Sequence, residues 1–189
     1  MNYQLAKALP VVVLVAATQA NASIVIDFED QPLGTPSNFV QEGLLIEFLQ
    51  FDPSEGVIDT AGNPGHALSS YGDGPIFRLR ITTLSGNDMV LDGFDYDITN
   101  VSGDTTIIGA RIHASNGFLI DDFIRNDATG GYLHEDPFNA QFHRLEFLFE
   151  SMGSQDSVHL DNIAITIIPA PGAGALLGVS GLLAGRRRR

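Results

Sequence analysis

Apolar and polar residues alternate along much of the chain between residues 23 and 168. Alternation with a period of two predicts β-strands that bury one face, and no part of this region has the spacing of an amphipathic helix. The runs give the following sets on one face: Ile24, Ile26 and Phe28; Phe77, Leu79 and Ile81; Phe94, Tyr96 and Ile98; Ile108, Ala110, Ile112 and Ala114; Leu145, Phe147 and Phe149.

Turn-forming residues separate these runs, and Asn116-Gly117 between two of them predicts a β-hairpin. About nine to ten short strands with one apolar face each need a second sheet to cover that face. The region therefore predicts an all-β, two-sheet β-sandwich, with a jelly roll as the preferred topology and a closed single-sheet barrel as the alternative.

In the last apolar run, over residues 158–167, the alternation of apolar and polar residues shifts by one position. Val158 and Leu160 set one alternation, and Ile163 and Ile165 set the other. Such a slip turns a strand inside out unless a bulge absorbs the extra residue. We therefore expect a β-bulge at Asp161-Asn162.

The first 22 residues have the pattern of a cleavable export signal. Lys7 precedes an almost wholly apolar run over residues 8–17, and Ala20-Asn21-Ala22 supplies the small-x-small pattern that signal peptidase requires. We expect cleavage after Ala22. The alternative, a buried core helix, fits poorly with Pro10 inside the run.

The last 21 residues combine a proline motif, an apolar run over residues 172–185 and a basic end. A helix over that run is ~21 Å long, shorter than a hydrocarbon core of ~30 Å, which favours a transient membrane anchor over a permanent one. The residues of the motif and the basic end are Pro169, Ala170, Pro171, Arg186, Arg187, Arg188 and Arg189. A plain C-terminal anchor is the alternative, and the arginines would stay on the cytoplasmic side.

This tail resembles the PEP-CTERM sorting signal, whose bearers are substrates of the membrane enzyme exosortase in Gram-negative bacteria that make exopolysaccharide. Ala170 departs from the motif, because the family has Glu at that place. The resemblance implies an exported protein of the cell surface or extracellular matrix that is held transiently in the inner membrane. It divides the chain into a signal peptide (1–22), a β-sandwich domain (23–168) and a sorting tail (169–189).

The charge of the predicted domain is strongly negative. All 23 acidic residues of the chain lie in it, against five arginines, which leaves a net charge of about −18. Such a domain repels nucleic acid and anionic lipid. The chain has no cysteine, which excludes a disulfide, a catalytic thiol and a Cys-based zinc site.

The two ends of the domain, Ile26-Asp27-Phe28-Glu29 and His159-Leu160-Asp161-Asn162-Ile163, resemble the edges of jelly-roll domains found in PEP-CTERM proteins and carbohydrate-binding modules. The resemblance implies that the first and last strands pair. It also implies a calcium ion between Glu29 and Asp161, with Asp27 or Asp30 as a further ligand. Carboxylate oxygens suit calcium, although no contiguous calcium-binding loop is present.

A sugar site usually stacks an aromatic ring on the pyranose. The chain has no Trp, and Tyr96 falls in a core phase. Tyr71 and Tyr132, in Gly-rich segments read as loops, are therefore the candidate ligand-binding residues. The histidines at 66, 113, 143 and 159 are scattered and read as surface or strand-edge residues.

The sequence predicts no enzyme, because it has no nucleophile elbow and no zinc-type spacing, and 23 acids make any carboxylate pair uninformative. We expect a structural or adhesive module that associates with exopolysaccharide. The alternatives are a calcium-dependent carbohydrate-binding module with a defined glycan and, second, a small secreted glycoside hydrolase.

Overall fold

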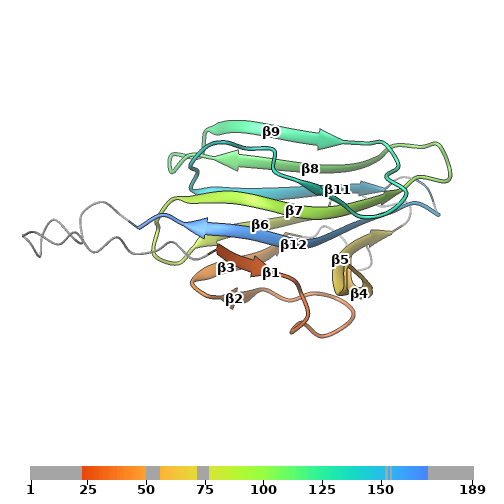
Figure 1. Cartoon of the computed structure of the whole chain (residues 1–189), viewed down its shortest axis with the longest axis horizontal. Coiled ribbons are helices and arrows are strands. Elements are labelled where there is room, and N and C mark those ends of the chain that lie inside the picture. The colour runs from red at the N-terminus through yellow and green to blue at the C-terminus, as the bar shows by residue number, and fades with distance from the viewer. Residues whose placement is uncertain (1–22, 50–55, 72–76, 152, 154, 170–189) are drawn as a thin grey trace, which may run out of the picture. The chain divides into compact units, whose positions relative to one another are not determined.

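The computed structural model describes residues 23–49, 56–71, 77–151, 153 and 155–169. The predicted signal peptide, and the sorting tail beyond Pro169, lie outside these residues. Within them all the regular structure is β-strand (Figure 1). None of the described segments forms a helix long and apolar enough to cross a membrane.

The strands form two antiparallel sheets, which we name A and B. Sheet A has the order β10-β7-β12-β5-β4, and β1 also pairs with β12. Its strands are β1 (Ser23–Ile26), β4 (Gly56–Gly62), β5 (Gly65–Tyr71), β7 (Met89–Thr99), β10 (Leu133–Glu135) and β12 (Ser157–Ile167).

Sheet B has the order β2-β3-β6-β11-β8-β9. Its strands are β2 (Phe39–Gln41), β3 (Leu44–Leu49), β6 (Phe77–Thr83), β8 (Thr106–His113), β9 (Leu119–Arg125) and β11 (Arg144–Ser151). From β5 to β12 the chain passes back and forth between the sheets, as it does in a jelly roll.

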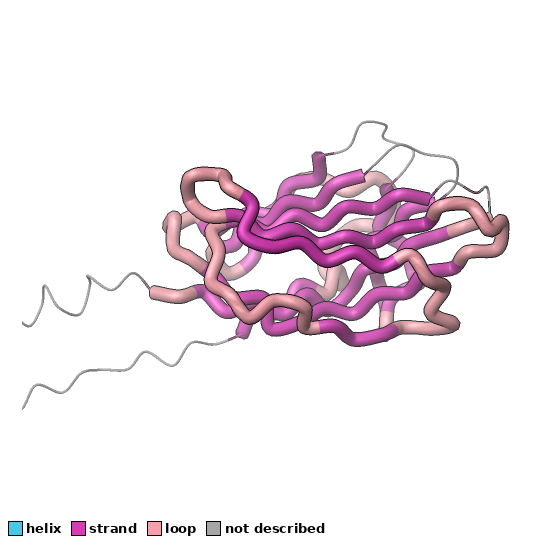
Figure 2. Tube along the Cα trace, turned by 90° about the horizontal axis from the view of Figure 1, so that it is seen from above, coloured by secondary structure: helices cyan, strands magenta, loops and turns pink. Residues whose placement is uncertain are grey.

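The predicted β-sandwich is confirmed, and the barrel alternative is wrong, because two separate sheets enclose one apolar core (Figure 2). Aromatic rings join the layers: Phe94 of sheet A meets Phe147 of sheet B edge-on, with ring centroids 4.9 Å apart. Edge-to-face contacts of this kind add to the stabilisation from apolar burial.

The predicted inward faces are confirmed, except that Ala114 is half-buried beyond the end of β8. The predicted hairpin at Asn116-Gly117 joins β8 to β9, and Tyr96 lies in the core. The predicted strand count was too low. The described residues form twelve strands, and β2 and β10, with three residues each, are too short to show an alternation.

Strand β12 organises sheet A. It pairs with β7 along its whole length, whereas its other edge is shared by two strands (Figure 1). Residues 157–160 pair with β5, and residues 163–166 pair with β1. The pairing of the first and last strands is thus confirmed. The register shift in β12 lies between Asp161 and Ala164, which confirms the predicted bulge at the point where β5 gives way to β1.

Candidate functional site

The β12 bulge gathers polar groups from distant parts of the chain. Asn162 adopts φ +49°, and its amide Nδ2 donates to the carbonyl of Asn63 at 2.8 Å and to Asp95 Oδ2 at 2.9 Å. Asp161 Oδ2 accepts the backbone N–H of Asn63 at 2.7 Å. The bulge therefore ties the β4–β5 turn, which contains Asn63, to β7.

Asp161 is completely buried, and its Oδ1 accepts the N–H of Asn162 at 2.8 Å. Burial, together with repulsion from Asp95 and Glu29, raises the pKa of this carboxyl to about 6, although the two backbone N–H groups oppose the shift. Among the residues that the structure describes, no basic side chain pairs with this carboxylate, so its acidic neighbours favour a proton or a cation at this place.

Glu29, the other predicted calcium ligand, approaches the same turn. Its Oε1 accepts the backbone N–H of His66 at 2.8 Å. It lies so close to Gly65 that a Cβ on that residue would be 1.7 Å from Oε1. Because Gly65 also has φ +93°, only glycine suits this position, and it lets the Glu29 carboxylate reach the turn.

Asp27 makes a local contact, in which its Oδ1 accepts the N–H of Glu29 at 3.3 Å. Among the described residues, no group of three or more His, Asp or Glu side chains is arranged to hold a metal ion. A calcium ion between Glu29 and Asp161 would therefore need backbone carbonyls or water as its other ligands, which calcium commonly accepts.

Tyr71 and Tyr132 lie together on the outer face of sheet A. The hydroxyl of Tyr71 donates to Asp59 of β4, and the hydroxyl of Tyr132 donates to the carbonyl of Ala61 of β4 at 2.8 Å. Tyr132 precedes β10, which pairs with β7, so its contact with β4 spans the sheet above β12 and β5. The two candidate residues, far apart in sequence, thus share one surface.

A chain of hydrogen bonds runs below these rings. Ser69 donates to Asp59 Oδ1 at 2.9 Å, so the Ser69 oxygen accepts from His159 Nδ1 at 2.7 Å. This arrangement places the proton of a neutral imidazole on Nδ1, and Nε2 then accepts from the hydroxyl of Ser157 at 3.0 Å. Burial lowers the pKa of His159, in keeping with the neutral ring.

Two sequence interpretations are wrong here. Tyr71 is the last residue of β5 and not part of a loop, and its side chain remains 45% exposed. His159 is buried in β12 and not a surface residue, with the Tyr71 ring edge-on at 5.5 Å. The Gly-rich segment that follows Tyr71 made the end of β5 hard to recognise in the sequence. His159 is buried because side chains of the neighbouring strand β5, Tyr71 and Ser69, pack against it.

The outer face of sheet A is acidic. Burial and, after it, the Asp59 carboxylate raise the pKa of Tyr71 to about 12. Burial also raises the pKa of Tyr132, and so do nearby carboxylates, first that of Asp161. Sequence reasoning missed Asp59 and Ser69, because neither belongs to a recognisable motif.

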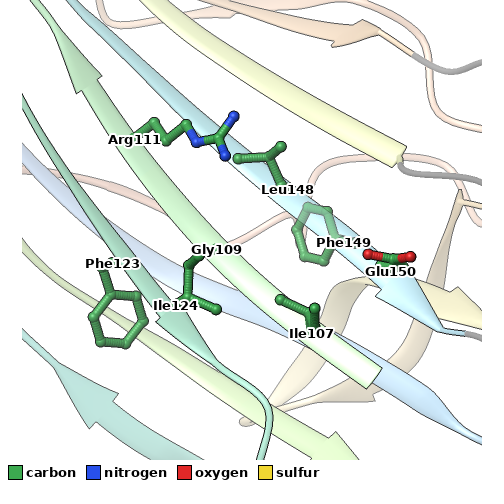
Figure 3. A pocket seen from close by; sticks show the side chains of 8 residues that line it. All are labelled: Ile107, Gly109, Arg111, Phe123, Ile124, Leu148, Phe149 and Glu150. Carbon is green, nitrogen blue, oxygen red and sulfur yellow. The ribbon is translucent and has the colours of Figure 1, made fainter. Parts of the chain in front are cut away.

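Sheet B has a separate hollow on its outer face, with a cavity volume of about 110 Å³ (Figure 3). It lies over Gly109 of β8, where a side chain would otherwise stand. Its lining comes from β8, β9 and β11: Ile107, Gly109, Arg111, Phe123, Ile124, Leu148, Phe149 and Glu150.

No protein-family model matches the sequence, and no curated protein matches it. Among solved structures, the chain is similar to a family 29 carbohydrate-binding module, at 14% identity over 78% of this chain and 89% of that one, with a TM-score of 0.43. A variant of that module in complex with mannohexaose gives the same identity and TM-score over 92% of its length.

A cleaved adhesin domain of the Lys-gingipain of Porphyromonas gingivalis is also similar, at 14% identity over 77% of this chain and 99% of that domain, with a TM-score of 0.45. Values this low assign the chain to no family.

Proposed function

We propose that this protein is a non-catalytic adhesive module of the cell surface or extracellular matrix, and that it binds exopolysaccharide through the outer face of sheet A. The observation that carries the proposal is the meeting of Tyr71 and Tyr132 over a hydrogen-bonded row of polar side chains. An exposed aromatic ring beside fixed polar groups is the usual composition of a sugar site.

The test is binding of the full chain to the exopolysaccharide of the producing organism. Tyr71→Ala removes the exposed ring, and we expect it to weaken binding roughly 3–10-fold. Tyr132→Ala should act in the same direction. Phe118→Ala is the matched control, because Phe118 is 74% exposed at the β8–β9 hairpin, away from this face.

Equal binding by the wild type and both tyrosine variants would reject the outer face of sheet A as the glycan site. No saturable binding by the wild type would reject the adhesive function itself. Turnover of the glycan, lost on changing one carboxylate, would instead support the hydrolase alternative.

The proposal includes a structural calcium ion held by Glu29 and Asp161. A cation there would offset the repulsion between two carboxylates that approach the same β4–β5 turn. We expect a chelator to lower the melting temperature of the wild type more than an equal ionic strength of sodium chloride does. Glu29→Gln should lose most of that response, whereas Asp104→Asn, at an exposed position between β7 and β8, should keep it.

The proposal also assigns export and sorting to the two ends of the chain. Signal peptidase would cleave after Ala22, and an exosortase would act on the Pro169–Pro171 motif while the terminal arginines hold the tail at the inner membrane. Mass spectrometry of the secreted protein should find Ser23 at the N-terminus. Replacement of Arg186–Arg189 by glutamine should reduce delivery to the surface, and unchanged delivery would refute the tail assignment.

A further inference from the structure

The arginines of the domain are confined to one sheet. All five lie on strands of sheet B, and the strands of sheet A contain none. Four of them alternate with buried apolar residues and so point away from the core: Arg78, Arg80, Arg111 and Arg144. The outer face of sheet A instead carries five carboxylates, from Asp59, Asp92, Asp95, Asp97 and Asp161.

Glu146 lies at the centre of the basic side chains on sheet B. Its Oε1 accepts from Arg80 Nε at 2.9 Å, and Arg144 Nε lies 3.3 Å away. This carboxylate is 7% exposed and neutralises part of the positive charge. Within the part of the chain that the structure describes, no ion pair joins Arg78 or Arg111 to a carboxylate.

Arg111 lines the hollow over Gly109, whereas Arg78 lies outside its lining. In the register of the sheet, Arg78 of β6 is opposite Leu148 of β11, and Leu148 is opposite Gly109 of β8. Ile107, Ile124 and Leu148 supply aliphatic walls, and the Arg111 guanidinium extends toward Leu148 (Figure 3). Neighbouring strands are ~4.8 Å apart, so Arg78 is about two strand spacings from the centre of the hollow.

We propose that this hollow is a second binding site, separate from the tyrosine surface, for a glycan that carries carboxylate groups. The aliphatic walls would contact the C–H face of a sugar ring. The guanidinium of Arg111 or Arg78 would bind the carboxylate, since the planar fork of arginine matches a carboxylate in two parallel hydrogen bonds.

The side chains of the hollow decide the class of ligand. Arg111 offers a carboxylate a partner that the strands of sheet A lack, although Glu150 also lines the hollow and Asp122 of β9 is opposite Arg111 in the register. The net charge of about −18 opposes any polyanion, so binding there depends on the short-range pair with arginine and on contact with the aliphatic walls. The site would give the molecule two glycan-binding faces with different preferences.

The probe is polygalacturonate, with dextran as an uncharged polymer, and the full chain is tested with chelator present so that calcium cannot bridge carboxylates. We expect the wild type to bind polygalacturonate in preference to dextran. Arg111→Gln should weaken that binding roughly tenfold or more, because it removes a charge-assisted pair. Arg125→Gln is the matched control, because Arg125 pairs with Glu135 and does not line the hollow.

Gly109→Ala tests the hollow without changing charge. A Cβ there would meet its nearest neighbour, the carbonyl oxygen of Phe123, at 3.4 Å, and side-chain atoms of Ile124 and Leu148 at 3.8 Å, which are ordinary contacts. We expect an unchanged melting temperature and weaker binding. Gly109→Leu, which fills more of the hollow, should weaken binding further.

Equal loss of binding in Arg111→Gln and Arg125→Gln would overturn the proposal, and so would equal binding of dextran. Self-association of the wild type that Arg111→Gln abolishes would also overturn it, since a second copy would then occupy the site through its acidic face. Tyr71→Ala should leave polygalacturonate binding unchanged. Failure at this site is therefore distinguishable from failure of the proposed exopolysaccharide site.

Discussion

Asp161 is a carboxyl group whose surroundings oppose its charge. Its folded-state pKa of about 6 lies above the ordinary value of 3.8. Between about pH 4 and pH 6 the folded protein therefore keeps a proton on Asp161 that the unfolded chain has already released. Through this group, stability is greatest below about pH 4 and declines as the pH rises through about 6.

We predict that, with chelator present, the melting temperature rises when the pH is lowered from 7 to 5. Calcium binds the ionised carboxylate, so calcium should flatten the profile in this range. Asp161→Asn should also reduce the slope, whereas Asp104→Asn, which removes an exposed charge between β7 and β8, should reduce it little. A slope that calcium and Asp161→Asn both leave unchanged would show that other acids cause it.

Single residues of the candidate sites were predictable where a resemblance or a residue type singled them out. Glu29 and Asp161 do approach one turn, and Tyr71 and Tyr132 do share one surface. Asp59 and Ser69 were not predictable, because they acquire their roles from partners across sheet A. The same holds for Asp156, whose carboxylate accepts the N–H groups of Val101 and Ser102.

At the scale of the element, the β12 bulge was predictable because apolar phase is a local property of the sequence. The change of phase between Leu160 and Ile163 leaves both residues buried only if one residue is inserted between the two halves. Edge strands show less alternation, since β9 buries one face only at Phe123. Its place after β8 was predictable from the hairpin residues Asn116-Gly117 and not from a two-residue period.

The bulge also yields a prediction about Asn162, which adopts φ +49° and bonds both Asn63 and Asp95. Asn162→Gly removes the hydrogen bonds and keeps the backbone unstrained, whereas Asn162→Val adds left-handed strain of about 1–2 kcal/mol. We expect the free energy of unfolding to fall in the order wild type, glycine variant, valine variant. Chemical denaturation measures it, and a valine variant as stable as the glycine variant would contradict the strain.

At the scale of the whole molecule, the β-sandwich could be predicted from the number of strands with one apolar face. The distribution of charge between its two sheets could not. The net charge of about −18 can be counted from the sequence. The sequence does not show that the arginines lie on one sheet and most of the outward-facing strand aspartates on the other. That separation depends on strand order, which brings β6, β8 and β11 together in sheet B.

Self-repulsion among the acids leads to a prediction about salt. Raising sodium chloride from 50 to 500 mM shortens the screening distance from ~14 to ~4 Å. We expect the melting temperature to rise by a few degrees, because repulsion in the compact state is weakened. Sodium sulfate would also strengthen apolar burial, so chloride is the suitable salt. A lower melting temperature at high chloride would mean that the ion pairs of sheet B outweigh the repulsion.

The position of β12 has a mechanical consequence. A tether attached to the residues that follow Ile167 would pull on a strand bonded to β7 on one side and to β5 and β1 on the other. Such a load must shear three sets of backbone hydrogen bonds together, whereas a load on an edge strand such as β9 breaks one set. A module attached in this way would hold its fold under drag while a polymer pulls on its outer faces.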